Sequence, residues 1–134
     1  MNLIEKLIRI DKETLLKKET KTMKSARLSK IVGEEANIVI KELSGRKLND
    51  ISAMMVDKDG NKDFSRLADI NLMYCVEGVV EPNLRDTNLM EHFGVKTPKD
   101  LAEILFDAEA GKIAGEIISL SGLSDDAEKD VKNS

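Results

Sequence analysis

The stretch that decides the fold is residues 67–123, which begins LADINLMYCVEGVVEPN and ends AGKIAGEIISLSGL. Between Leu67 and Val80 the apolar side chains fall on more than one side of a helix, so we expect this helix to be central. The pair Glu81-Pro82 should end the helix. Proline lacks the N–H that would continue it and disfavours helical geometry in the preceding residue.

A second helix is predicted to run unbroken from Thr97 to near Gly122, as the longest element of the chain. Threonine can cap the first-turn amides, Pro98 suits the first helical position, and glycine is typical of a helix end. Gly111 and Gly115 stand four apart on one face of this helix. Because each costs about 1 kcal/mol of helix propensity relative to alanine, the pair predicts close approach of another helix, within the domain or from a second subunit.

Upstream of this stretch the pattern changes. The runs 26–32 and 38–40 contain β-branched residues and flank Gly33-Glu34-Glu35, which predicts a β-hairpin. Ser44 then suits the cap of a helix with one apolar face. The predicted fold class is α+β, mostly α, with an N-terminal β-hairpin followed by a compact bundle of about four helices.

The length of 134 residues is that of one domain. We expect residues 1–22 to form a basic N-terminal helix or arm, because Leu3, Ile4, Leu7 and Ile8 fall near helical spacing. Residues 23–123 should form a single α+β globular domain. Residues 124–134 contain too little apolar side chain for a core and are predicted to be a mobile acidic tail.

The charge is unevenly distributed along the chain. Residues 1–32 carry nine Lys and Arg against four Asp and Glu, whereas the remainder carries twelve against twenty-one. A basic arm of this kind could follow phosphates in a nucleic acid. It contains no aromatic residue that would stack on a base, so a solvated basic face, or one that contacts the acidic part of a neighbouring copy, is the favoured interpretation.

No catalytic, cofactor or metal site is predicted. The single cysteine, Cys75, lies in an apolar run, and the single histidine, His92, lies in another segment with no nucleophile signature around either. A calcium loop at Asp57-Lys58-Asp59-Gly60 fails because placing Gly60 at the sixth position puts Arg66 where the acidic twelfth ligand belongs. A surface turn explains the same residues.

The chain is expected in a reducing cytosol. A lone cysteine forms no disulfide within the chain. Charges at Glu5, Lys6, Arg9 and Asp11 interrupt the apolar residues of the N-terminus, which argues against a signal peptide or a membrane span.

Three short motifs occur in a characteristic order. They are the corner Val80-Glu81-Pro82-Asn83, the segment from Leu89 to Phe93-Gly94, and the ending Leu120-Ser121-Gly122. In this order, after a part that contains a hairpin, they resemble the XkdN-like phage tail assembly chaperones over roughly residues 25–123. The family often has an aromatic residue after the Pro-Asn pair, and Leu84 departs from that pattern.

The resemblance implies a protein without enzymatic activity that works in the cytoplasm of a bacterial host during assembly of a phage or phage-like tail. Such proteins coat the tape measure protein, a long helical chain with apolar stripes, and are absent from the finished particle. Many members are also made in a longer, frameshifted form. Lys132-Asn133 could be encoded by an A-rich slippery site, and a merely polar terminus accounts for them equally well.

Other functions are distinguished by their partners. A structural tail component would stay in the mature particle, and a small nucleic-acid-binding regulator would use the basic arm. For binding of the tape measure protein we expect an exposed apolar edge on the last helix, made by Ile117, Leu120 and Leu123. The alternative is that all three belong to the core.

Overall fold

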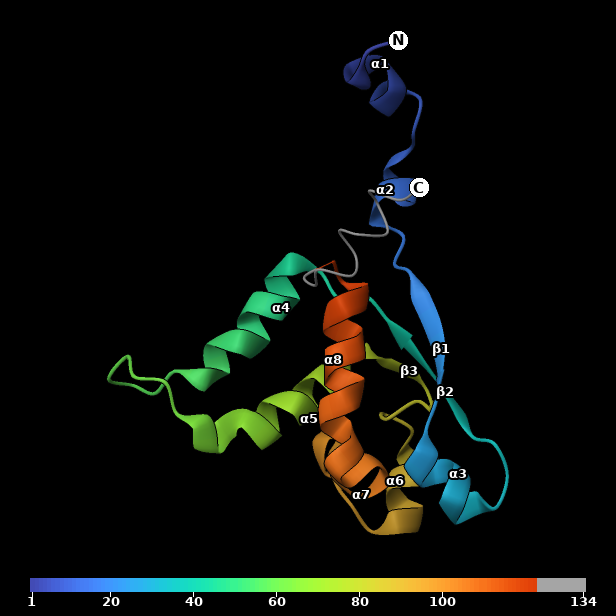
Figure 1. The fold of residues 1–134 in the computed structure, drawn as a ribbon, viewed down its shortest axis with the longest axis vertical. Helices are drawn as coiled ribbons and strands as arrows, with labels where there is room; N and C mark the ends of the chain where they lie inside the picture. Colours follow the sequence, from blue (N-terminus) through green and yellow to red (C-terminus); the bar gives the residue numbers. More distant parts are fainter. Residues whose placement is uncertain (123–134) are drawn as a thin grey trace.

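The fold is a small antiparallel sheet packed against helices. The computed structural model describes residues 1–122, and Figure 1 shows the elements along the chain. The class is α+β with more helix than strand, as predicted, and the strands lie in the order β1-β2-β3. The elements are α1 (Leu3–Ile8), α2 (Lys12–Leu16), β1 (Thr20–Lys24), α3 (Ala26–Val32), β2 (Asn37–Lys41), α4 (Gly45–Ser52), η1 (Ala53–Met55), η2 (Phe64–Arg66), α5 (Leu67–Gly78), β3 (Val79–Glu81), α6 (Thr87–Phe93), α7 (Pro98–Phe106), η3 (Asp107–Glu109) and α8 (Ala110–Leu120).

The core lies between β2 and the helices α5, α7 and α8. Along β2 the side chains alternate, with Ile38 and Ile40 buried, as expected of a strand with one covered face. Leu101 and Phe106 of α7 are fully buried beside them. α5 packs against α4, α7 and α8, and it buries residues on several sides, which confirms its predicted central position.

The predicted hairpin is wrong in its first strand. Residues 26–32 form helix α3, capped by Ser25 at its start and by Gly33, with φ of 83°, at its end. The strand that pairs with β2 is β1, from Thr20↔Lys41 to Lys24↔Asn37, in a segment that the prediction had divided between the N-terminal arm and the globular domain. Polar side chains are tolerated there because β1 is an edge strand with no fully buried residue.

The central helix ends before the predicted corner. It stops at Gly78, and Val79–Glu81 form the edge strand β3, which pairs with β2. Proline still terminates the regular structure, but Val79 and Glu81 pair with Ile40 and Val39 of β2, a distant partner that the local sequence pattern does not reveal. The Ser44 cap is confirmed, since its side chain accepts from Lys47 N at the start of α4.

The predicted helix from Thr97 to Gly122 is two helices. Thr97 does cap the first, because its Oγ1 accepts from Asp100 N at 3.1 Å and Pro98 is the first helical residue. The chain then turns at Asp107, whose φ of 48° lies in the left-handed region that residues with a Cβ rarely adopt. α7 and α8 therefore lie on either side of the short turn η3.

A polar junction holds this turn against α3. Arg27 donates from Nε to Leu105 O and from Nη2 to Ile104 O, both at 3.0 Å. Ser25 is fully buried and donates from Oγ to Glu109 Oε1, while Glu109 Oε2 accepts from Arg27 N. The end of α7 thus receives hydrogen bonds from a segment that lies far away in the sequence.

The close helix contact is at Gly78, not at the two glycines of α8. A Cβ at Gly78 would lie 2.5 Å from Cδ1 of Ile117, so α5 and α8 meet where no side chain fits. A Cβ at Gly111 would lie 3.5 Å from Asn71 Nδ2, an ordinary contact, and one at Gly115 would meet nothing within 4 Å. Within the described residues the pair therefore marks no unusually close helix contact, and approach of a second subunit to Gly111 and Gly115 stays a prediction.

The boundary predicted at residue 22 falls inside β1. The N-terminal arm is defined here as residues 1–18, all of which are exposed. Figure 1 shows it beyond the start of β1, away from the helices of the body. The predicted tail, residues 124–134, lies outside the described residues.

Candidate partner-binding surfaces

The residues predicted to form a partner-binding edge do not lie together on the surface. Ile117 is fully buried and packs on Gly78. Leu120 is partly buried against the core, and Leu123 lies outside the described residues. The prediction of an exposed edge is wrong for Ile117, because the apolar stripe of α8 is the face that covers the core.

The Val80-Glu81-Pro82-Asn83 motif forms the corner after β3. Val80 is 43% exposed, and the Glu81–Pro82 peptide is cis. The side-chain Oδ1 of Asn83 accepts from Arg85 N at 3.0 Å, and the main-chain carbonyl of Asn83 accepts from Asp86 N at 3.1 Å. Both hydrogen bonds close the turn. The next residue, Leu84, is fully buried and fixes this turn to the core.

The other motif residues end helices. Gly94, with φ of 69°, caps α6, and Gly122, with φ of 88°, follows α8, so both use the left-handed conformation open to glycine. Phe93 is half exposed, and its ring meets that of His92 edge to face, with centroids 4.8 Å apart. These positions shape the fold and leave Val80 and Phe93 as the exposed apolar members.

A hollow of about 620 Å³ lies between α3 and η3. Ile31 contributes apolar surface to it, and Arg27, Lys30 and Glu109 contribute polar groups, while the fully buried Phe106 lies behind its wall. Ile31 and its neighbour Val32 are 63% and 60% exposed. A polar rim around apolar surface is the composition of a protein-binding surface.

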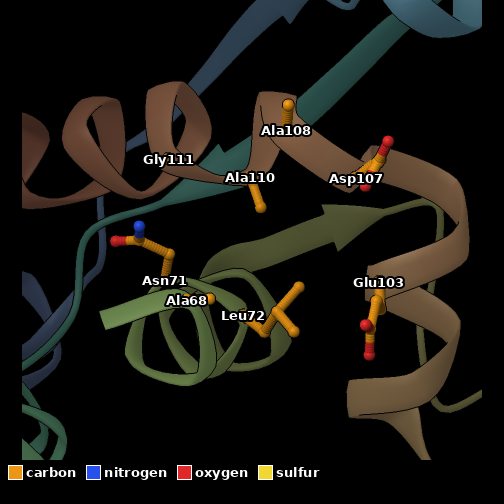
Figure 2. Close-up of a pocket in the computed structure, with 8 residues that line it drawn as sticks. All are labelled: Ala68, Asn71, Leu72, Glu103, Asp107, Ala108, Ala110 and Gly111. Atoms are coloured by element: carbon orange, nitrogen blue, oxygen red, sulfur yellow. The ribbon is translucent and has the colours of Figure 1, made fainter. Parts of the chain in front are cut away.

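A second, smaller hollow lies where α5 meets the turn between α7 and α8. Figure 2 shows Asn71 and Leu72 of α5 facing the start of α8, with Glu103 and Asp107 at one end. Its volume is about 210 Å³, and alanines and Gly111 line much of it. That size suits one side chain of a partner better than a cofactor.

The N-terminal arm carries the most exposed apolar surface described. Leu3 and Ile4 are each 68% exposed and Ile8 is 77% exposed, while no residue of α1 or α2 is buried. Leu3, Ile4, Leu7 and Ile8 share one face of α1, because they follow the spacing of successive helical turns. The sequence pattern had indicated this face, and the structure shows it uncovered.

A further exposed cluster lies at the corner between α4 and α5, which sequence reasoning missed. We define the corner patch as Met54, Val56, Phe64 and Leu67, of which Phe64 is 70% exposed. The two short turns η1 and η2 pack together there, and Arg66 Nη1 donates to the carbonyls of Met54 and Val56. A phenylalanine in a run of polar residues, 57–66, was the available signal.

The described residues hold little reactive chemistry. Cys75 is fully buried, and burial raises the pKa of its thiol to about 12, so the thiolate needed of a nucleophile does not form near neutral pH. Within residues 1–122, no group of three or more His, Cys, Asp or Glu side chains is arranged to hold a metal ion. The same residues contain no helix long and apolar enough to cross a bilayer.

Asp57 and Gly60 form a turn. The Asp57 Oδ1 atom accepts from Asp59 N and Asn61 N, and Gly60 has φ of 83°. The structure thus confirms the surface turn that we predicted for these residues in place of a calcium loop.

The fold and its surfaces define a small α+β protein with exposed apolar residues on an arm, a corner and a helix edge. The sequence model of the phage XkdN-like tail assembly chaperone proteins matches residues 4–133, and the chain belongs to this family.

A solved structure supports the fold. The crystal structure of the protein YqbN, a structural genomics target, is similar with a TM-score of 0.56 and 15% identity, covering 79% of this chain and 88% of that one. No curated protein sequence matches the chain.

Proposed function

We propose that this chain is a tail assembly chaperone that binds the tape measure protein in the cytoplasm of the bacterial host, keeps it soluble, and is absent from the mature particle. The observation that carries the proposal is the family match over residues 4–133. A tape measure protein with apolar stripes along a helix would aggregate unless a partner covered those stripes reversibly.

The surface that we propose for this partner is the α3 edge, defined as Ile31 and Val32 beside the hollow between α3 and η3. Both side chains are mostly exposed, and the hollow gives room for apolar side chains of a helix laid against it. Leu120, which is partly buried, and Leu123 remain candidates for the border of the interface. Ile117 is excluded because no solvent reaches it.

The proposal includes a second form of the chain. A longer product made by frameshifting near Lys132-Asn133, as the resemblance implies, would keep the described fold and extend the chain. Expression from the native gene, with intact mass measured on the products, tests this point. A single product of the shorter length would remove the longer form from the proposal and leave the chaperone activity untouched.

Co-expression with the tape measure protein of the same phage tests the central proposal. The wild-type chain should bring the tape measure protein into the soluble fraction and co-purify with it. The pair Ile31→Gln and Val32→Gln should abolish this effect, whereas Val80→Gln, at an exposed apolar position on β3, should leave it unchanged. An insoluble tape measure protein in the presence of folded wild-type chain would refute the proposal.

The rival function, a structural tail component, differs in where the chain ends up. Mass spectrometry of purified mature particles separates the two, because only a component should be recovered in stoichiometric amount. Recovery of the chain in washed particles would refute its role as a chaperone that leaves before completion.

A further inference from the structure

We propose that the predicted acidic tail, residues 124–134, docks on a basic hollow of the same chain. We define the basic hollow as the space of about 440 Å³ at the corner after β3, whose lining includes Lys41, Glu77, Val80, Asn83 and Arg85. This inference goes beyond the proposed function, because it concerns a contact within one chain that needs no tape measure protein.

Cationic groups outnumber carboxylates around the basic hollow. Glu77 accepts from Arg85 Nη2 at 3.3 Å through Oε1, and its Oε2 lies 4.0 Å from Lys47 Nζ. Lys41 forms no ion pair with any carboxylate of residues 1–122. Even when the exposed Glu81 of the corner is counted with Glu77, the three cations exceed the two carboxylates. The basic hollow is therefore suited to an anionic segment.

The tail carries the complementary charge in its first residues. Asp125, Asp126 and Glu128 lie within residues 124–128, which contain no Lys or Arg. The whole tail carries four Asp and Glu against two Lys. The negative charge is therefore concentrated next to the point where the chain leaves α8.

The tail also begins close to the basic hollow. Ser121 Oγ accepts from Leu43 N at 2.9 Å, which fixes the end of α8 beside a residue only two positions beyond Lys41. Figure 1 shows the end of α8 beside the chain that leaves β2 for α4. Two extended residues span about 7 Å, and the six residues 123–128 can span about 20 Å. The carboxylates in the first half of the tail can therefore reach the amine of Lys41 while the body keeps its structure.

The N-terminal arm is the rival basic surface near this point. Residues 1–18 carry five Lys and Arg against three Asp and Glu, and all of them are exposed. The basic hollow is concave, and Val80, which is 43% exposed, adds apolar surface to it. A segment docked there is removed further from water than one lying along the arm. We therefore expect the basic hollow, rather than the arm, to hold the tail.

Docking would connect the end of α8 to the corner after β3. It would leave the α3 edge uncovered, because neither residue of that edge lines the basic hollow. The charges involved are partly exposed, so salt should weaken the contact. The tail would therefore be a reversible cover of this corner rather than a fixed part of the core.

Carbodiimide crosslinking of the purified full chain tests the inference. This reagent joins a carboxylate to an amine only where the two groups already meet, and mass spectrometry identifies the linked pair. We expect links from the tail carboxylates to Lys41 to exceed those to Lys17 and Lys18 of the arm by about fivefold. In about 1 M salt, where the Debye length falls to about 3 Å, this preference should disappear.

An exchange of charge gives the sharpest outcome. The hollow variant Lys41→Glu with Arg85→Glu should lose the contact, and so should the tail variant Asp125→Lys with Asp126→Lys, because like charges then meet. The four substitutions together should restore a link between position 41 and position 125 or 126. Circular dichroism checks that each variant is folded. An equal mixture of isotope-labelled and unlabelled chains shows whether each link joins residues of one chain.

Amide NMR spectra give an independent measurement without chemical modification. Asp125→Asn with Asp126→Asn should shift the amide signals of the residues that line the basic hollow and leave those of the α3 edge unchanged. The matched control, Glu34→Gln with Glu35→Gln, also removes two carboxylates, both of them exposed, and should not move the signals of the hollow.

Three results would overturn the inference. Links that go mainly to Lys17 and Lys18 would assign the tail to the arm. Links that join labelled to unlabelled chains would assign it to a second copy. Signals of the basic hollow that stay in place in the tail variant would show that the tail does not occupy it. None of these results bears on the solubility of the tape measure protein in co-expression, so the two proposals fail separately.

Discussion

Replacing Gly78 with alanine adds a single Cβ atom between α5 and α8 and so tests how closely these helices pack. The added Cβ would lie 2.5 Å from Cδ1, 2.8 Å from Cγ2 and 3.0 Å from Cγ1 of Ile117. Ile117 is fully buried and β-branched, so its side chain has neither space nor rotamer freedom to turn aside. The two helices must move apart to accept the methyl group.

The expected decrease in the free energy of unfolding of Gly78→Ala follows from two opposing effects. Overpacking of a dense core costs about 1–3 kcal/mol. Alanine gains at most about 1 kcal/mol of helix propensity over glycine, and less at Gly78, which is the last residue of α5. We therefore expect Gly78→Ala to lower the free energy of unfolding by about 1–2 kcal/mol.

Urea unfolding followed by circular dichroism measures this change, and the two glycines of α8 supply controls. Gly115→Ala meets nothing within 4 Å, and Gly111→Ala meets only Asn71 Nδ2 at 3.5 Å. Both lie inside α8 without positive φ, so each should raise the free energy of unfolding by up to about 1 kcal/mol. The same substitution thus has opposite signs at neighbouring helices.

A second substitution at the contact identifies its cause. Ile117→Ala removes all three atoms that the new Cβ would meet, at a cost of about 2–5 kcal/mol. In that background Gly78→Ala should become neutral or stabilising, because the methyl group enters the space left by isoleucine. If Gly78→Ala is neutral in the wild-type chain, or equally destabilising in both backgrounds, the reasoning about this contact is refuted.

The remaining predictions concern the turn between α7 and α8 and the buried thiol. Asp107→Gly should raise the free energy of unfolding by about 1 kcal/mol in urea, because glycine adopts a φ of 48° without strain. Ser25→Ala should lower it by about 1–3 kcal/mol in the same assay, since it removes a helix cap and leaves the Glu109 carboxylate short of a buried donor. Cys75 should resist a thiol reagent in the folded chain at pH 8 and react fully in denaturant, because a pKa raised to about 12 leaves almost no thiolate at that pH until unfolding restores the ordinary value.

Sequence reasoning located the helices where local signals were strong. Ser44 and Thr97 cap the helices they were expected to cap, because a short polar side chain before an apolar periodic run has few other roles. It failed where distant residues decided the outcome. The turn at Asp107 depends on hydrogen bonds from Ser25 and Arg27, about eighty residues earlier, and nothing in the α7–α8 pattern reports them.

The candidate surfaces show that local sequence also cannot decide which apolar residues are exposed. Ile117 and Ile8 both lie on apolar stripes with helical spacing, yet the first is fully buried and the second is 77% exposed. Periodicity predicts that a helix has an apolar face, but it does not predict whether the rest of the fold buries that face. For the arm, burial of this face depends on the direction in which the chain enters the following strand, β1, which the hydrogen bonds between Glu19 and Glu42 fix. An apolar face on a short helix therefore indicates a partner only when the tertiary structure shows that the chain itself leaves that face exposed.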